Sequence, residues 1–371
     1  MSAGRLVRAP LRRLRAGAAR LRTRGWPPYS RLFVLGDEAS WALDDEAAYV
    51  TSVARRAGYR LAPQAWASGA RRQVVFHTSH FAALDPRWTG STHRLGLSYF
   101  HGRPGTPGHP EFDRAYAALR GDPARFERVH VTHREMEHLV RSAGVEAERI
   151  HRIPIGIEID AFPLVDSSRR EAARRSFGLP QDAFVVGSFV KDGTGFGDGR
   201  EPKPIKGPDV LVEALTSLAD RVPELVVLLT GPARGYVREV LADRSVRFAH
   251  RLLESRDGLT VAYHALDACV LASRQEGGPK SILESMAAGI PLVTTRAGQA
   301  PDLVTDGENG LLVDVEDAVA LTEALVRVHD DEALAARLRV AGRLVAEAMS
   351  HEALAPRWDA LLDGFAERPD D

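Results

Sequence analysis

Cysteine, long apolar runs and the common metal-binding motifs are scarce or absent. A single cysteine, Cys269, in 371 residues excludes an intramolecular disulfide and fits a reducing compartment. No run of about 18 apolar residues occurs, so no transmembrane helix is expected. Neither H-E-x-x-H nor D-x-D is present, and one cysteine argues against a structural zinc site. We therefore expect neither a bound metal nor a cofactor.

Lysine is also rare. The chain has four lysines, at 191, 203, 206 and 280, so nearly all of its 49 basic residues are arginines. A composition that prefers arginine elsewhere indicates that these four positions need a compact point charge rather than a planar fork. All four lie in one part of the chain, which marks that part for an anionic ligand.

The near-neutral net charge of −1 conceals a basic N-terminus. Residues 1–25 contain eight arginines and no acid, so the remainder of the chain is acidic. An acidic body disfavours nucleic-acid binding. Two interpretations of residues 1–25 stay open. Apolar residues recur at helical spacing, which predicts an amphipathic helix; they are Val7, Leu11, Leu14, Ala18 and Leu21. The high density of arginines also fits a disordered, solvated arm.

In the first of these interpretations, residues 5–26 contact an anionic membrane, with Trp26 at the interface. A targeting sequence is a third interpretation, although the apolar segment is too broken for a secretory signal. We expect a cytoplasmic protein that is either free or peripheral on the inner face of the membrane.

From residue 31 onward, short apolar runs alternate with helical patterns. Strands are predicted at 31–35, 73–77, 95–100, 128–132, 150–155, 184–190, 225–230, 268–272, 291–295 and 310–313. Helices are predicted at 44–57, 133–143, 208–221 and 279–288, from 233 and from 316 onward. This alternation predicts an α/β fold of two doubly wound, Rossmann-like domains with the ligand site in the cleft between them. The expected domains are 26–158, completed by a helix at 351–366, and 159–350.

The most informative segment is 273–289, SRQEGGPKSILESMAAG, which follows an apolar strand and opens a helix. Glu276 lies in the loop at the strand's carboxyl end, and Glu284 lies early in the helix. Gly277 and Gly278 allow a ligand to approach the backbone closely. The unpaired amides at the start of the helix, together with Lys280, favour an anion.

This sequence resembles the retaining nucleotide-sugar glycosyltransferases of family 4, which have the GT-B fold. The resemblance rests on PIGIEIDAF at 154–162, VVGSF at 185–189, KGPD at 206–209 and LLTG at 228–231. It also covers YHALDACVLASRQEGG at 263–278, AAGIPLVTT at 287–295 and GQAPDLVTDGENGLLV at 298–313. It is strong only over about 150–330 of the chain.

The resemblance implies a role for each matching residue of the donor site. Glu276 would contact hydroxyls of the donor sugar, and Glu284 would accept hydrogen bonds from the ribose. Lys206 would pair with the diphosphate as the sugar–phosphate bond breaks. Amides around Gly277, Gly278, Lys280 and Ser281 would hold the sugar and the diphosphate.

The sequence departs from the family pattern at one position. Family members usually carry an arginine just after the glycine of the first strand of the second domain, and this chain has Ser188 there. Lys191 is the nearest cation and is the predicted substitute. It opens a long loop, 191–208, which we interpret as facing the phosphates.

In the first half, His101 ends a predicted strand and corresponds to a histidine of the family near the reacting sugar carbon. Gly36 follows the first strand, but two acids replace the second glycine usual there. His101 and Gly36 are the predicted acceptor-side residues, and His101 is a catalytic candidate with Glu276 and Lys206.

The predicted function is metal-independent, retaining transfer of a hexose-type sugar from a nucleoside-diphosphate sugar to a hydroxyl of a glycan, lipid or small molecule. One alternative is another GT-B enzyme, either a phosphorylase or a nucleotide-sugar epimerase. Another is a non-catalytic protein that binds nucleotide sugars.

Overall fold

The computed structural model describes residues 18–36, 41–195, 197–253 and 255–368 and divides the chain into two compact units. Unit 1 comprises Met1–Ile153 and Leu354–Asp371, and unit 2 comprises Pro154–Ala353. The boundary between the units therefore lies at 153/154, before the predicted one at 158/159. Residues 154–158 belong to unit 2 because Ile157 packs into one of its apolar clusters and the Ile155 amide donates to the side chain of Gln299.

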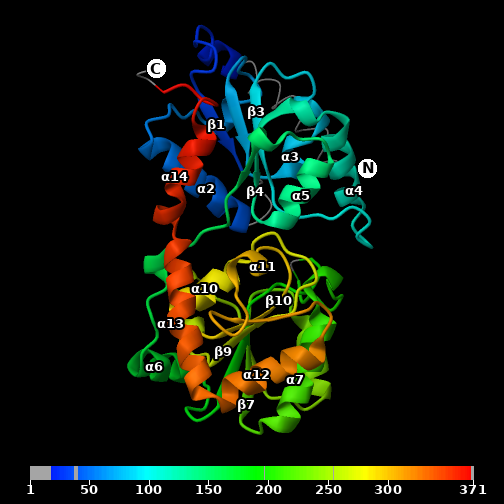
Figure 1. Ribbon diagram of the computed structural model, residues 1–371, viewed down its shortest axis with the longest axis vertical. Helices are drawn as coiled ribbons and strands as arrows, with labels where there is room; N and C mark the ends of the chain where they lie inside the picture. Colours follow the sequence, from blue (N-terminus) through cyan, green and yellow to red (C-terminus); the bar gives the residue numbers. More distant parts are fainter. Residues whose placement is uncertain (1–17, 37–40, 196, 254, 369–371) are drawn as a thin grey trace. The chain divides into compact units, whose positions relative to one another are not determined.

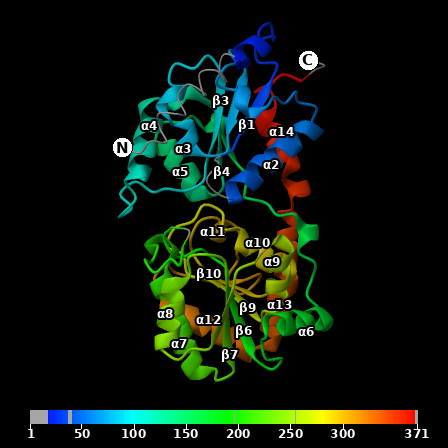
Figure 2. The same cartoon turned by 180° about the vertical axis from the view of Figure 1, so that it is seen from behind.

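Unit 1 contains a five-stranded sheet in which every strand is parallel to its neighbours. Its strands, in spatial order, are β1 (Leu32–Leu35), β2 (Val74–His77), β3 (Arg94–Tyr99), β4 (Phe126–Val131) and β5 (Ile150–Arg152). Its helices are α2 (Trp41–Arg56), α3 (His80–Ala83), α4 (Pro110–Gly121), α5 (Arg134–Ser142) and α14 (His351–Leu362). Figures 1 and 2 show α3, α4 and α5 on one side of the sheet and α2 and α14 on the other.

Helices cover both faces of the sheet because the chain leaves β1 in one direction along the sheet and then crosses back to continue in the other direction. Leu61 forms a parallel bridge with Leu32, so α2 leads from β1 to a short extended segment beside it. The chain then returns to β2 past Trp66 and Ala67, which pack in the cluster on the α3–α5 face. Unit 1 is therefore doubly wound, as predicted.

The predicted N-terminal arm, 1–25, and the membrane-contact segment, 5–26, lie largely outside the described residues. Residues 18–22 are helical. The Trp26 ring packs against Phe33 and Trp66, with centroids 6.4 and 6.1 Å away. Trp26 is partly buried against the apolar cluster of unit 1. Among the described helices, none has the length and apolar character needed to cross a membrane.

The last helix belongs to unit 1 from Leu354 onward, because its tryptophan completes an apolar face of that unit. Trp358 is 1% exposed and packs edge-on against Phe76 and Tyr49, with ring centroids 5.8 and 6.3 Å away. The Arg128 guanidinium also donates to the carbonyl of Leu361 at 2.9 Å. The described chain therefore returns to unit 1 after passing through unit 2.

His130 connects three parts of unit 1 from a fully buried position. Its Nε2 donates to the Ile153 carbonyl at 2.7 Å, so its Nδ1 accepts from the Ser98 hydroxyl at 2.9 Å. Its ring packs on Trp358, with centroids 4.5 Å apart. Burial lowers the pKa of His130 to about 4.

We predict that the stability of the protein falls as the pH drops from about 6.5 towards 4. Over this range the unfolded chain takes up a proton at residue 130 that the folded chain does not. His130→Gln can still donate to Ile153 but does not titrate, so its denaturation midpoint should change less with pH. An unchanged pH dependence in this variant would contradict the assignment.

Unit 2 contains a six-stranded parallel sheet. Its strands, in chain order, are β6 (Phe184–Ser188), β7 (Leu225–Thr230), β8 (Phe248–Arg251), β9 (Ala268–Leu271), β10 (Leu292–Thr295) and β11 (Leu311–Val313). Its helices include α6 (Ser167–Phe177), α7 (Pro208–Arg221), α8 (Gly235–Asp243), α9 (Arg256–His264), α10 (Lys280–Ala288), α11 (Ala300–Leu303), α12 (Ala318–Asp330) and α13 (Glu332–Ala348).

The strand order β11-β10-β9-β6-β7-β8 reverses direction between β6 and β9. One apolar cluster packs α7, α8 and α12 against one face of the sheet, and a second packs α6, α9 and α10 against the other. In such a sheet, ligands bind beyond the carboxyl ends of the strands at the point of reversal. The loops after β6 and β9 are therefore the first place to look for a site.

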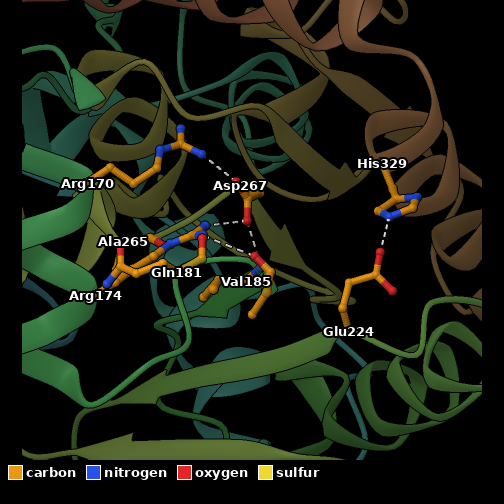
Figure 3. Close-up of polar contacts among 9 residues, drawn as sticks. Arg170, Arg174, Gln181, Val185, Glu224, Ala265, Asp267 and His329 are labelled. Atoms are coloured by element: carbon orange, nitrogen blue, oxygen red, sulfur yellow. Dashed lines mark hydrogen bonds and ion pairs between the residues drawn. The ribbon is translucent and has the colours of Figure 1, made fainter. Parts of the chain in front are cut away.

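The opposite, amino-terminal ends of β6 and β9 are joined by a half-buried carboxylate. Asp267 pairs with Arg170 and Arg174 of α6 and accepts a hydrogen bond from the Val185 amide at 2.7 Å (Figure 3). Arg174 also donates to the carbonyls of Gln181, Ala183 and Ala265. This network attaches α6, which has few apolar residues, to the sheet.

We predict that Asp267→Ala lowers the free energy of unfolding by about 3 kcal/mol, because it leaves the buried Arg174 guanidinium without its anion. Chemical denaturation measures this loss. Asp314→Ala removes an exposed carboxylate that pairs with Arg296 and should cost less than about 1 kcal/mol. Equal losses in the two variants would contradict a structural role for the Asp267 network.

Candidate functional site

The loops after β6 and β9 bring Lys206 and Glu276 together. The Lys206 ammonium lies 2.6 Å from both carboxylate oxygens of Glu276, and the Ser273 hydroxyl donates to Oε1 at 2.8 Å. The Glu276 side chain is 8% exposed and that of Lys206 is 19% exposed. Two of the predicted catalytic residues therefore form a largely buried ion pair at the point where the strand order reverses.

The backbone around this pair is held by a second set of contacts. The Ile205 carbonyl, in the turn that carries Lys206, accepts from the amides of Arg274 and Gln275. The Arg274 guanidinium donates to the Pro204 carbonyl and forms two hydrogen bonds to Asp209. Arg274 therefore fastens the turn before Lys206 to the loop that carries Glu276, a role that sequence reasoning missed.

Two glycines permit the close packing of these loops. Gly207 has φ +60°, and a Cβ there would lie 2.0 Å from the Ala272 carbonyl oxygen. Gly298 has φ +59°, and its Cβ would lie 2.7 Å from the Cβ of Glu276. Side chains at either position would separate the backbone segments that hold the ion pair.

We predict that Arg274→Ala loosens the turn before Lys206. The amides of Lys206 and Gly207 bond to the carbonyls of Lys203 and Pro204, and they should exchange hydrogen faster when the guanidinium is removed. Exchange measured by mass spectrometry tests this. Arg296→Ala removes an arginine paired with Asp314 and serves as the control; equal acceleration in the two variants would contradict the proposed clamp.

The remaining donor-site predictions gather around α10. The buried Gly277 and the half-buried Gly278 lie in the loop before it, and a Cβ on Gly278 would lie 2.8 Å from the Gln299 amide oxygen. Lys280 and the buried Ser281 are its first two residues, and its N-cap is Pro279, which supplies no side-chain cap. The first amides of the helix are therefore left uncapped by that residue, as an anion site requires.

Glu284 lies one turn further along α10 and is held by a tyrosine that sequence reasoning missed. The hydroxyl of Tyr263, which is fully buried in α9, donates to Glu284 Oε2 at 2.9 Å. Burial, followed by the charge of Glu284, raises the pKa of Tyr263 well above its usual value. The tyrosine remains protonated and continues to donate, which fixes one oxygen of the carboxylate.

A buried arginine lies beside Ser188, the residue that departs from the family pattern. Arg234 is 0% exposed and donates to the Ser188 carbonyl and hydroxyl. It also pairs with Asp192 at 2.9 Å. The loop from Lys191 is thus anchored to the ends of β6 and β7, and Lys191 itself is half-buried next to this anchor. Sequence reasoning named Lys191 and missed Arg234.

The acceptor-side predictions lie at the carboxyl edge of the first sheet. Gly36 directly follows β1, and His101 follows β3. The His101 ring lies 5.8 Å from that of His80 and 5.5 Å from that of Phe112, centroid to centroid. Burial, with a smaller effect of His101, lowers the pKa of His80 well below its usual value. His80 is therefore neutral at neutral pH.

Within the described residues, no group of three or more histidine, cysteine, aspartate or glutamate side chains is arranged to hold a metal ion. The cation that the structure places beside Glu276 is the Lys206 ammonium, and Lys191 and Lys280 stay predictions. At the carboxyl edge of the unit 2 sheet, Lys206 can neutralise an anion, and the adjacent Glu276 carboxylate can accept hydrogen bonds.

Comparisons with known proteins give a consistent result. Residues 197–331 match the model of the family described as glycosyl transferases group 1. A D-inositol 3-phosphate glycosyltransferase of Xylanimonas cellulosilytica is 34% identical over 251 residues, which cover 64% of this chain and 56% of that protein. The D-inositol 3-phosphate glycosyltransferase of Corynebacterium glutamicum is 30% identical over 213 residues, which cover 54% of this chain and 48% of that protein. The chain spans about half the length of these curated relatives.

Solved structures with the same fold cover most of the chain. Sucrose-phosphate synthase of Thermosynechococcus elongatus aligns with a TM-score of 0.66 at 22% identity, over 86% of this chain and 77% of its own. HepE of Anabaena, in complex with UDP-glucose, aligns with a TM-score of 0.71 at 16% identity, over 90% and 99% of the two chains. The fold is GT-B.

The predicted resemblance to GT-B glycosyltransferases is thereby confirmed, in fold and in the family match. The prediction of an enzyme class, glycosyltransferase, agrees with the names of the curated relatives. The matched segment, 197–331, contains both Lys206 and Glu276 as well as Arg274, Lys280 and Glu284.

Proposed function

We propose that this protein is a retaining glycosyltransferase, of family 4 type, that moves a sugar from a nucleoside-diphosphate sugar to a hydroxyl. The observation that carries this proposal is the Lys206–Glu276 pair at the strand reversal of unit 2. An ammonium beside a carboxylate suits a ligand that presents a diphosphate next to sugar hydroxyls. UDP-sugars are the first donors to consider, because HepE was solved with UDP-glucose.

On the donor side, Lys206 neutralises the charge that grows on the leaving diphosphate, and Lys191 adds a second cation nearby. Glu276 accepts hydrogen bonds from the sugar, and Glu284, oriented by Tyr263, accepts them from the ribose. The start of α10, where the N-cap Pro279 supplies no side-chain cap, supports the diphosphate through its amides.

On the acceptor side, Gly36 and His101 of unit 1 contact the hydroxyl compound. In the proposed reaction the sugar–phosphate bond breaks and a bond to the acceptor oxygen forms on the same face of the sugar. A leaving phosphate oxygen takes the acceptor's proton. Side-chain cations and helix amides stabilise the charge, so the reaction is metal-independent.

The curated relatives are named for D-inositol 3-phosphate, which makes this compound the first acceptor to assay. Contact of the basic N-terminal segment with an anionic membrane, in a cytoplasmic protein, belongs to the same proposal.

The proposal is tested by thermal shift with UDP, GDP, ADP and their sugars, followed by transfer assays with the donor that binds. A ligand at 100 times its dissociation constant should stabilise the protein by about 2.7 kcal/mol. Glu276→Ala should reduce the turnover number by roughly a hundredfold or more, since it removes a group that contacts the reacting sugar. Addition of EDTA should leave the rate unchanged.

Asp314→Ala removes a carboxylate of unit 2 that does not contact Lys206 and should transfer sugar at the wild-type rate. Full turnover by Glu276→Ala would contradict the catalytic assignment. Phosphate-dependent activity without a nucleotide sugar would instead identify a phosphorylase. Donor binding without turnover of any acceptor would favour a nucleotide-sugar-binding protein.

A further inference from the structure

Lys206 and Glu276 have different partners in the proposed reaction, yet in the structure they bind each other. Within the described part of the chain, the ammonium donates to no acceptor other than the two oxygens of Glu276. The carboxylate has one further donor, the Ser273 hydroxyl. A diphosphate that takes Lys206 therefore removes the principal donor of a carboxylate that is 8% exposed.

The backbone leaves little room to relieve this conflict. The Ile205 carbonyl holds the amides of Arg274 and Gln275, and Gly298 packs against the base of Glu276. The two segments therefore keep their separation, and any change on ligand binding is a movement of side chains, chiefly of the flexible lysine. Competition for the ammonium is thus built into the site.

We propose that Glu276 acts as a specificity-determining residue that favours an intact nucleotide sugar over the free nucleoside diphosphate. An intact donor supplies sugar hydroxyls that replace the ammonium as donors to Glu276. A free nucleoside diphosphate supplies none, so it takes Lys206 at the cost of a buried, poorly paired carboxylate. This inference rests on the proposed function, because it assumes that Lys206 meets the diphosphate.

The same competition acts after transfer. The product diphosphate has lost its sugar, so Glu276 is again without hydroxyl donors and draws Lys206 back. Return of the ammonium to the carboxylate weakens the hold on the product. The ion pair between Lys206 and Glu276 thus re-forms after each transfer.

Isothermal titration of wild-type protein and Glu276→Gln with UDP, GDP and ADP tests this proposal. The amide keeps the size of the side chain but loses the charge that competes for Lys206. We expect the variant to bind the free nucleoside diphosphate about tenfold more tightly, the scale of one hydrogen bond to a charged group. It should bind the corresponding nucleotide sugar no more tightly than the wild type does.

A double-mutant cycle separates competition for Lys206 from general repulsion between Glu276 and the phosphates. In a Lys206→Met background, Glu276→Gln should change the affinity less than twofold. Asp314→Asn, which removes one carboxylate of unit 2 that does not contact Lys206, should have an equally small effect. Equal tightening with and without Lys206, or no tightening in Glu276→Gln, would overturn the proposal.

Failure of this inference and failure of the proposed function give different results. If the wild type binds a nucleotide sugar and transfers it, but Glu276→Gln binds the free diphosphate no more tightly, the inference alone is wrong. If neither protein binds any of the three diphosphates or their sugars, the proposed function is wrong and the inference falls with it.

Discussion

The ion pair between Lys206 and Glu276 joins residues 70 positions apart at the reversal of strand order in unit 2. Much of the surrounding structure keeps this pair in place. Arg274 fastens the turn of one partner to the loop of the other, and the Asp267 network joins the opposite ends of the same two strands. The strands β6 and β9 are thus tied at both ends, and the site is held by rigid elements.

Most of the fold could be predicted because most of its strands are largely buried and read as apolar runs. Strand β7 begins and ends where it was expected, at Leu225 and Thr230. Strand β8, Phe248–Arg251, was missed because it is an edge strand of mixed polarity and incomplete burial. Helix α6 was missed because it lacks a broad apolar stripe; it buries Arg174, whose anionic partner, Asp267, lies 93 residues away.

The candidate site could be predicted where it depends on short motifs and not where it depends on packing. Lys206 and Glu276 were both named from the sequence, and the structure brings them together. Arg234 could not be recognised, because its role depends on a strand end and on Asp192, 42 residues away. Tyr263 was missed for a similar reason: its hydroxyl meets Glu284 only once α9 and α10 pack together.

The account's central claim is that a nucleotide sugar binds at Lys206 and Glu276 by exchanging their mutual contact for contacts to the donor. A crystal structure of the protein with an intact UDP-sugar tests this claim most directly. The account predicts diphosphate oxygens within hydrogen-bonding distance of Lys206 Nζ and sugar hydroxyls on the Glu276 carboxylate. A nucleotide bound elsewhere, with the two side chains still 2.6 Å apart, would contradict it.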